Sequence, residues 1–404
     1  MVRRLWHHRH DVNSARPQFD QRLLDRPFSV TARAVKSGEI PGAVLAVASR
    51  DEVVRTEAFG GPAGARITTE HRFGIASITK PIVATAMLQL VEAGSLVLSD
   101  PVARYLPGFR PPPAVPGEPG GEAITVWHLL THTSGMADVD RSTFSRTPPD
   151  ADRMVRLAAT RPLTFAPGTS YRYCSDTFFV LGAIAQRLTD LPLSALLQER
   201  IFEPLGMAVT SFARQHAAAA SAPVSGADLA PDQTSRLVAW LEAVEYPGGG
   251  LWSAEPDLVR FGQAMLEGGV LDGRRVLGGP FVEFMTREQT RGIQEPGRPP
   301  REPHYGLGWD KPGLDGRLPG SPRAFGHSGM TGCRLTVDPE AGIVIVFLAN
   351  VVNLESRYWQ RAAAAVYGAL ENRRLRVVPA PPRGSVTLAR APQAHLFDTG
   401  NGGG

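Results

Sequence analysis

A serine and a lysine three residues apart stand out in a chain that uses very little lysine. Ser77 and Lys80 lie in the segment ASITKP, and of the 43 lysines and arginines only 3 are lysines. The residues after Ser77 are apolar at helical spacing as far as a glycine at position 94, which predicts a helix over 77–93. Ser77 then lies at the N-terminus of this helix, and Lys80 lies one turn later on the same face.

This spacing permits nucleophilic catalysis. A serine hydroxyl is a weak nucleophile unless a base within hydrogen-bonding distance takes its proton. A buried lysine can lose its proton and act as that base, whereas arginine stays protonated. The helix N-terminus adds a backbone N–H beside the serine, which can stabilise a developing oxyanion. Taken alone, however, Ser-x-x-Lys is more typical of a serine N-cap followed by a solvated lysine.

The composition of the chain is that of an ordinary globular protein and argues against several classes of function. The chain has 404 residues, of which 43% are hydrophobic and 20% charged, as in ordinary globular proteins. Its net charge is +4, but the arginines are scattered rather than gathered in a basic stripe, so nucleic-acid binding is not predicted. With only 2 cysteines, neither a disulfide framework nor a multi-cysteine zinc site is expected. We expect no metal and no cofactor.

The apolar runs of the sequence indicate neither a secretory signal nor a membrane-spanning segment. The first twenty residues include arginines and histidines but no apolar run of the kind found in secretory signals. The longest apolar run, at 341–352, is too short to cross a bilayer and predicts a buried strand. We therefore expect a cytoplasmic protein with no membrane association and no obligate protein partner.

The spacing of apolar residues predicts the strands and helices that position Ser77. Residues 42–60 and 332–350 each consist of two apolar runs around a polar turn, which predicts two hairpins that share one antiparallel sheet. An alanine-rich helix at 354–372 is expected to pack on this sheet. Further helices are predicted at 125–131, 175–189 and 254–267. The fold class is therefore α/β (α+β), an antiparallel sheet flanked by helices with a mostly helical inserted region.

The predicted domain boundaries follow this division. We expect a flexible N-terminal arm at 1–24, a discontinuous sheet domain at 25–110 and 300–372, a largely helical domain at 111–299, and a C-terminal tail at 373–404.

Several segments resemble, in order, those of class C β-lactamases, D-alanyl-D-alanine carboxypeptidases and family VIII esterases. The similarity extends from about Lys36 to Asn372 and is carried by FGIASITKP and the residues after it, WHLLTHTSGM at 127–136, FAPGTSYRYCSDTFF at 165–179, YPGGGLWSAEPDLVRF at 246–261, YGLGW at 305–309 and FGHSGMTGCRLTV at 325–337. The resemblance implies a β-lactamase/transpeptidase-like fold. It also implies hydrolysis through an acyl-enzyme, with a small ester, amide or peptide-like molecule as substrate.

The resemblance also assigns roles to residues. It implies that Ser77 is the acylated nucleophile and that Lys80 lowers the affinity of the Ser77 hydroxyl for its proton. Tyr173 lies where the family has the tyrosine of the proton relay, and a lysine ammonium would stabilise its anion. The backbone N–H groups of Ser77 and Met330 are expected to bind the oxyanion, while Tyr173 or His327 helps to protonate the leaving group.

Two positions depart from the family pattern. Ser175 stands where many relatives have asparagine, so the amide-binding role is weakened. His327-Ser328-Gly329 occupies the place of Lys-Thr-Gly, and the loss of a fixed charge disfavours recognition of a substrate carboxylate. We therefore predict a carboxylic ester as the substrate in preference to a β-lactam. An acyltransferase or peptide cyclase on the same scaffold, and a penicillin-binding-like sensor without catalysis, remain alternatives.

Other motifs predict less. His128 and His132 have metalloprotease spacing, but the glutamate of that motif is replaced by leucine. GHSGM lacks the last glycine of an α/β-hydrolase elbow. The glycines at 248–250 lack the Gly-Lys-Ser/Thr of a phosphate loop. Cys174 has no identifiable base and is predicted to be a packed thiol.

Overall fold

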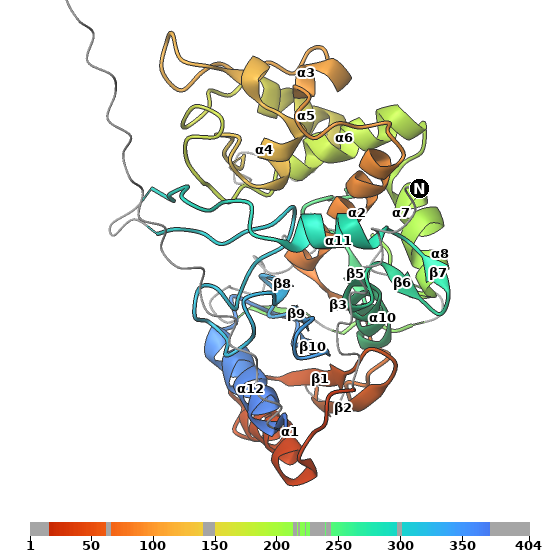
Figure 1. Ribbon diagram of the computed structural model, residues 1–404. Coiled ribbons are helices and arrows are strands. Elements are labelled where there is room, and N and C mark those ends of the chain that lie inside the picture. The colour runs from red at the N-terminus through yellow and green to blue at the C-terminus, as the bar shows by residue number, and fades with distance from the viewer. Residues whose placement is uncertain are drawn as a thin grey trace, which may run out of the picture. The chain divides into compact units, whose positions relative to one another are not determined.

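The central element of the fold is a five-stranded antiparallel sheet with the strand order β2-β1-β10-β9-β8 (Figure 1). The computed structural model describes residues 16–61, 66–139, 150–212, 216, 219–222, 224–226, 239, 244–296 and 301–371. The sheet strands are β1 (Gly42–Ala48), β2 (Val53–Gly60), β8 (Phe325–Ser328), β9 (Arg334–Asp338) and β10 (Ile343–Leu348). Short strands outside the sheet are β3 (Phe73–Gly74), β4 (Ser225–Gly226), β5 (Trp252–Ser253), β6 (Val270–Leu271), β7 (Arg274–Arg275) and β11 (Val351–Val352).

The two predicted hairpins are confirmed, and they share the sheet. Strands β1 and β10 pair antiparallel with Leu45 opposite Phe347, so segments about 300 residues apart in the chain become neighbours. Both strands are buried along their whole length. Their side chains alternate between two hydrophobic cores because successive residues of a strand point to opposite faces. The sheet is therefore covered on both sides.

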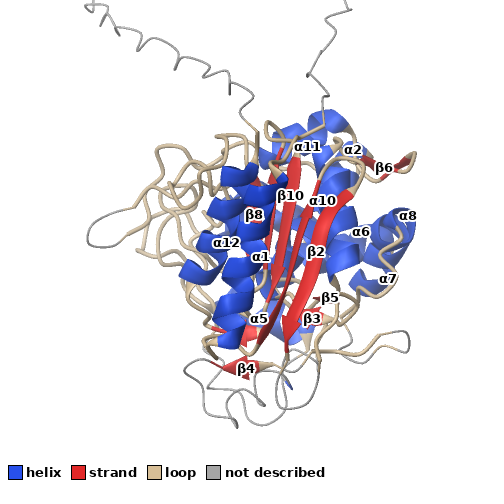
Figure 2. Cartoon of the chain, turned by 90° about the horizontal axis from the view of Figure 1, so that it is seen from below, coloured by secondary structure: helices blue, strands red, loops and turns tan. Residues whose placement is uncertain are grey.

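One face of the sheet is covered by α1 (Gln21–Lys36) and α12 (Ser356–Ala369), which lie side by side (Figure 2). Helix α12 confirms the helix predicted at 354–372. Helix α1 was not predicted, because Pro27 in its interior obscures the apolar spacing. Its N-cap is Asp20, whose side chain accepts hydrogen bonds from the backbone N–H groups of Arg22 and Leu23. Phe19 and Leu24 are buried, so the predicted arm at 1–24 is too long at its C-terminal end.

The other face is covered by α10 (Glu255–Leu266), which contacts β1, β9 and β10. Gly262 allows this close approach, since a Cβ atom there would lie 2.5 Å from Val344 Cγ1. The sequence places the helix at 254–267 within the helical domain, but α10 belongs to the layer that covers the sheet. Periodicity gives the apolar face of a helix and not the partner of that face.

The remaining helices surround α2 (Thr79–Glu92), which is buried on nearly all sides. Helices α6 (Thr177–Thr189) and α7 (Leu193–Leu197) contact it, and α3 (Val102–Tyr105), α4 (Val126–Leu130) and α5 (Ala151–Thr160) gather around α6 (Figure 1). The helical elements are completed by α8 (Glu203–Leu205), α11 (Gly279–Thr286), the π-helical turn η4 (Gln198–Phe202) and the 3₁₀ turns η1 (Ala76–Ile78) and η2 (Gly121–Ala123). The helices predicted at 77–93, 125–131 and 175–189 are thus confirmed.

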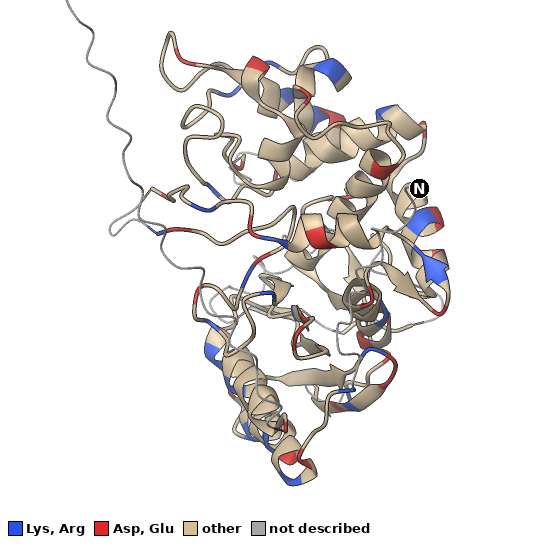
Figure 3. Cartoon of the chain, viewed as in Figure 1, with Lys and Arg blue, Asp and Glu red and all other residues tan. Residues whose placement is uncertain are grey.

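The chain divides into a unit that ends at Leu370 and a second unit, Glu371–Gly404. The predicted tail at 373–404 lies outside the described residues. Among the residues that are described, no single helix is long and hydrophobic enough to cross a membrane; only the pair Thr177–Thr189 and Leu193–Leu205, bent by 77°, has a suitable length and composition. Figure 3 shows basic residues (blue) and acidic residues (red) scattered over many of the same elements.

A buried carboxyl group in this fold provides a test of its energetics. Glu255, at the start of α10, is 2% exposed, and its Oε1 has no hydrogen-bond partner among the described residues. Burial raises the pKa of Glu255 from 4.5 to about 7, although the Thr56 hydroxyl lowers it in part. The unfolded chain ionises this group near pH 4.5, whereas the folded chain resists ionisation until about pH 7. Stability is therefore lost as the pH rises through this window.

We expect Glu255→Gln to stabilise the protein at pH 8 by about 1–3 kcal/mol and to have little effect at pH 5. Urea denaturation at the two pH values measures the difference. Glu267→Gln is the control, because Glu267 is an exposed residue that follows the same helix and pairs with Arg50. It should change the stability by less than about 1 kcal/mol at either pH. A gain for Glu255→Gln that is equal at both pH values would show that ionisation is not its cause.

Candidate active site

The predicted nucleophile lies where the chain enters α2. Ser77 is the middle residue of η1 and is half-buried, and Lys80 is the second residue of α2 and fully buried. The preceding residue, Ala76, has a φ of 45°, a conformation that costs an L-residue energy and is held here by the surrounding structure. Ser77 is thus presented from a tight turn and not from a regular helix.

The Lys80 ammonium group points back at the serine. Its Nζ lies 3.0 Å from Ser77 Oγ, 3.1 Å from Ser175 Oγ and 2.6 Å from the carbonyl oxygen of Gly248. A carbonyl oxygen can only accept, so one N–H is always directed at Gly248. When Lys80 is neutral, its two protons can remain on Gly248 and Ser175 while its lone pair faces Ser77. The geometry therefore allows Lys80 to accept the Ser77 proton.

Gly248 is a site residue that the sequence did not reveal. A Cβ atom at this position would lie 2.6 Å from the carbonyl oxygen of Ser175, so only glycine fits between Ser175 and the turn. Gly249 in turn lies beside the backbone of Ala76. The three consecutive glycines lie in a segment that carries the family resemblance, but neither that resemblance nor the phosphate-loop motif predicts a contact with Lys80. Gly248 and Gly249 lie beside residues of the candidate site.

Tyr173 comes from the loop before α6 and lies over Lys80. Lys80 Nζ is 4.8 Å from the centre of the Tyr173 ring, which is within the range of a cation–π contact. The ring is half-buried, while the hydroxyl is inaccessible and makes no hydrogen bond of normal geometry with the described residues. Burial raises the pKa of Tyr173, and the nearby Ser77 and Ser175 hydroxyls lower it only in part. This shift favours the protonated form of Tyr173, and its predicted role in the proton relay remains a prediction.

Ser175 lies on the same loop and accepts a hydrogen bond from Lys80. The adjacent Cys174 is buried, and burial raises the pKa of its thiol. A protonated thiol is a poor nucleophile, which agrees with the prediction of a packed cysteine.

His327 lies in β8 at the edge of the sheet and is 6% exposed. Burial, followed by the charge on Lys80, lowers the pKa of His327 to about 3, so the ring is neutral at physiological pH. Its Nε2 is 2.9 Å from the Tyr305 hydroxyl and its Nδ1 is 3.0 Å from the carbonyl oxygen of Ser328. Neither nitrogen is free to serve a substrate in this arrangement.

The segment His327-Ser328-Gly329, which stands in the place of the family's Lys-Thr-Gly, lies beside the turn that contains Ser77. Strand β8 contacts η1, and a Cβ atom on Gly329 would lie 2.4 Å from the carbonyl oxygen of Ile75. Met330 follows with an exposed side chain, and its carbonyl accepts a hydrogen bond from the N–H of Asn353. The backbone N–H of Met330 lies in a turn and donates to none of the described residues, while that of Ser77 lies within η1. Their predicted role in binding an oxyanion remains a prediction.

The two histidines with metalloprotease spacing do not face each other. His128 caps α4, since its Nδ1 accepts from the backbone N–H of Thr125 at 3.0 Å. His132 lies beyond the end of α4, where its φ of 59° turns it into the core. Only His128 lies within α4, so the two histidines do not share a helix face.

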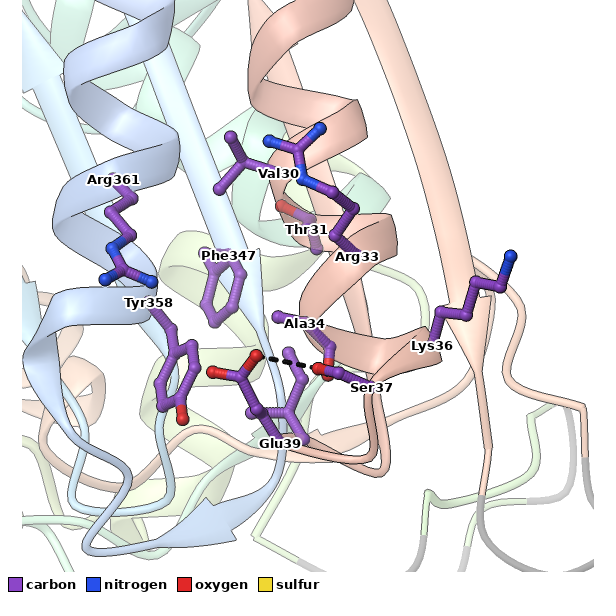
Figure 4. A pocket seen from close by; sticks show the side chains of 11 residues that line it. Val30, Thr31, Arg33, Ala34, Lys36, Ser37, Glu39, Phe347, Tyr358 and Arg361 are labelled. Carbon is purple, nitrogen blue, oxygen red and sulfur yellow. Dashed lines mark hydrogen bonds between the residues drawn. The ribbon is translucent and has the colours of Figure 1, made fainter.

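A hollow of about 690 Å³ between α1 and α12 lies on the opposite face of the sheet from Ser77 (Figure 4). Phe347 lies in it, and Glu39 accepts a hydrogen bond from Ser37 near one end. It shares no residue with the candidate active site.

The sheet, the buried α2 and the placement of Ser77, Lys80 and Tyr173 define the class of protein. The family model described as "Beta-lactamase" matches residues 29–368, so the chain belongs to the β-lactamase family. The relatives of this serine hydrolase family include esterases, carboxypeptidases and penicillin-binding proteins.

Two curated relatives illustrate the range of the family. Penicillin-binding protein 4 of Amycolatopsis lactamdurans is 30% identical over 372 residues, which cover 90% of this chain and 94% of the relative. Esterase EstB of Burkholderia gladioli is 37% identical over 206 residues. That second match covers 46% of this chain and only 50% of the esterase.

Solved structures share the fold at lower identity. EstCE1, described as a hydrolase with promiscuous acyltransferase activity, has a TM-score of 0.71 and 23% identity, covering 86% of this chain and 99% of that one. A family VIII carboxylesterase has a TM-score of 0.69 and 21% identity, covering 88% and 100%. The predicted β-lactamase/transpeptidase-like fold is thus confirmed.

Proposed function

We propose that this protein hydrolyses small carboxylic esters through an acyl-enzyme formed on Ser77. The observation that carries the proposal is the position of Lys80 Nζ, 3.0 Å from Ser77 Oγ and also bonded to the Gly248 carbonyl. A lysine held in this way, with no access to solvent, is suited to take the serine proton as attack begins.

The reaction we propose has two halves. Lys80 Nζ accepts the Ser77 proton while Oγ attacks the ester carbonyl, and the N–H groups of Ser77 and Met330 bind the oxyanion. As the ester C–O bond breaks, Tyr173 gives its proton to the departing alkoxide and regains one from the Lys80 ammonium. Water then attacks the acyl-enzyme, its proton follows the reverse path, and the acid and free Ser77 result.

The preference for an ester rests on charge. His327 is neutral where a lysine would offer a fixed charge to a substrate carboxylate. Arg334, in the neighbouring strand, donates to the carbonyl oxygens of Gly329 and Cys333, each at 2.8 Å. An uncharged acyl group therefore suits this site better than the carboxylate of a β-lactam.

The experiment that tests the acyl-enzyme is covalent labelling. A fluorophosphonate probe should attach to Ser77, identified by mass spectrometry of the digested protein. The absence of an adduct on Ser77, with adducts formed by a known serine esterase in parallel, would contradict the proposal and favour a non-catalytic sensor.

A substrate comparison tests the preference. We expect kcat/KM for p-nitrophenyl butyrate to exceed that for nitrocefin by at least about 10²-fold, since the site lacks a matched charge for the carboxylate. Both are measured by absorbance on the same enzyme preparation. Efficient turnover of nitrocefin with negligible ester hydrolysis would reverse the assignment.

A second candidate is acyl transfer, favoured by the description of the structural relative EstCE1 as a hydrolase with promiscuous acyltransferase activity. An alcohol or amine would replace water in the second half-reaction. Product analysis with an added alcohol measures the partition between ester and acid, and a dominant transfer product would favour this function over hydrolysis.

A further inference from the structure

Three buried side chains from distant parts of the sequence are connected by hydrogen bonds next to the candidate active site. His132 follows α4, Tyr305 lies in the segment before β8, and His327 lies within β8. The Tyr305 hydroxyl is 3.3 Å from His132 Nε2 and 2.9 Å from His327 Nε2. The exposed fractions of the three residues are 1%, 3% and 6%. Their rings also surround Tyr173, whose centre is 4.3 Å from that of His132.

The backbone groups at the two ends determine the direction of this chain of hydrogen bonds. The N–H of Cys174 lies 3.3 Å from His132 Nδ1, and since an N–H can only donate, that nitrogen carries no proton. Neutral His132 therefore has its proton on Nε2 and donates it to the Tyr305 oxygen. At the other end, the Ser328 carbonyl can only accept, so His327 donates from Nδ1.

Tyr305 connects the two histidines without conflict. Its oxygen accepts from His132 Nε2–H, which leaves its own proton for the unprotonated Nε2 of His327. Every donor then has an acceptor. A proton added to His327 Nε2 would face the Tyr305 oxygen and leave the Tyr305 hydroxyl proton without a partner, so the network itself disfavours an imidazolium.

We infer that Tyr305, anchored by His132, is a positioning residue that holds His327 as the neutral Nδ1–H tautomer. Through the bond from Nδ1 to the Ser328 carbonyl, this tautomer fixes the end of β8. The next two residues, Gly329 and Met330, are the part of the site proposed to bind the oxyanion. The inference rests on the proposed function for its kinetic consequence, but not for the tautomer.

The same arrangement removes one of the predicted roles of His327. Its Nδ1 proton is bonded to Ser328, and its Nε2 accepts the proton of Tyr305. His327 therefore has no proton to give a leaving group, and Tyr173 is left as the donor.

The kinetic test removes only the connecting hydroxyl. We expect Tyr305→Phe to lower kcat for p-nitrophenyl butyrate by about 10- to 100-fold while KM changes less than about 3-fold, because misalignment of the oxyanion site affects the transition state more than binding. Tyr171→Phe is the matched control. Tyr171 is also buried, and its ring centre is 6.2 Å from that of Tyr305, but its hydroxyl is not part of the hydrogen-bond network of His132, Tyr305 and His327. Its kcat should stay within about 2-fold of the parent value, and equal losses in both variants would overturn the inference.

The tautomer has a separate test that needs no catalysis. Nitrogen-15 NMR of histidine-labelled protein at pH 7 should show a protonated Nδ1 and an unprotonated Nε2 for His327, with the reverse for His132. The His327 signals are assigned by their absence from His327→Gln. A protonated Nε2 on His327 would refute the inference, even if Tyr305→Phe fails to fold. The expected tautomers in a protein without esterase activity would instead refute the proposed function alone.

Discussion

Ser77→Ala is expected to lower kcat/KM for p-nitrophenyl butyrate by at least about 10⁴-fold and to abolish labelling by a fluorophosphonate. The reason is that no acyl-enzyme can form without the Ser77 oxygen, whereas the oxyanion donors alone give only a small residual rate. Ser77 is half-buried and the substitution removes a single oxygen atom, so it should leave the fold intact. Steady-state kinetics and intact-protein mass spectrometry measure the two effects.

Ser175→Ala is the matched control for this experiment, because Ser175 also accepts a hydrogen bond from Lys80 but is not the proposed nucleophile. This variant should keep the covalent adduct and lose about 10-fold in rate or less. If Ser175→Ala rather than Ser77→Ala abolished labelling, the nucleophile would have been assigned to the wrong hydroxyl.

Lys80→Met is expected to lower kcat/KM by about 10²- to 10⁴-fold, the usual scale of general acid–base catalysis. Methionine is an unbranched side chain only one atom shorter than lysine and is tolerated at buried positions, but its sulfur is too weak a base to take the Ser77 proton. Lys80→Arg should be equally inactive although it keeps the charge, because guanidinium does not lose its proton. The comparison separates the need for a base from the need for a cation.

Another buried lysine supplies the control for these variants. Lys311 is 3% exposed, burial lowers its pKa to about 8, and its Nζ donates to the carbonyl oxygen of Arg323 at 3.2 Å. Lys311→Met should therefore change kcat/KM by less than about 2-fold while carrying a similar structural cost. An active Lys80→Arg enzyme would show that charge, not proton transfer, is what the site requires of Lys80.

The local elements of the fold follow from the sequence because their signals are local. The hairpins at 42–60 and 332–350 have alternating or continuous apolar runs around polar turns, and the helix after Ser77 has a clear apolar spacing and a glycine stop. Helix α1 was missed because Pro27 interrupts an otherwise regular pattern. Helix α10 was predicted correctly but placed in the wrong layer, since a helix does not encode which surface it will cover.

The predicted site residues are of two kinds. Ser77 and Lys80 are one helical turn apart, so their proximity is dictated by local geometry. Tyr173, Ser175 and His327 are distant in sequence, and only the ordered resemblance to a family placed them beside the serine. The structure brings Ser175 onto Lys80 and the Tyr173 ring over it. Both ring nitrogens of His327 are instead hydrogen-bonded, to the Tyr305 hydroxyl and to the Ser328 carbonyl.

The residues of the chain predict the type of chemistry, because Ser77 and Lys80 lie one turn apart and the ordered family resemblance implies the roles of nucleophile and base for them. The groups that orient Ser77 and Lys80 become visible only in the folded chain. The acceptor that orients Lys80 is the backbone carbonyl of Gly248, and although the glycines at 248–250 are conspicuous in the sequence, nothing in the sequence indicates that this carbonyl faces Lys80. The tautomer of His327 likewise depends on Tyr305, His132 and two backbone groups. Hydrogen-bond direction is a property of the assembled neighbours, not of the residue that carries the proton.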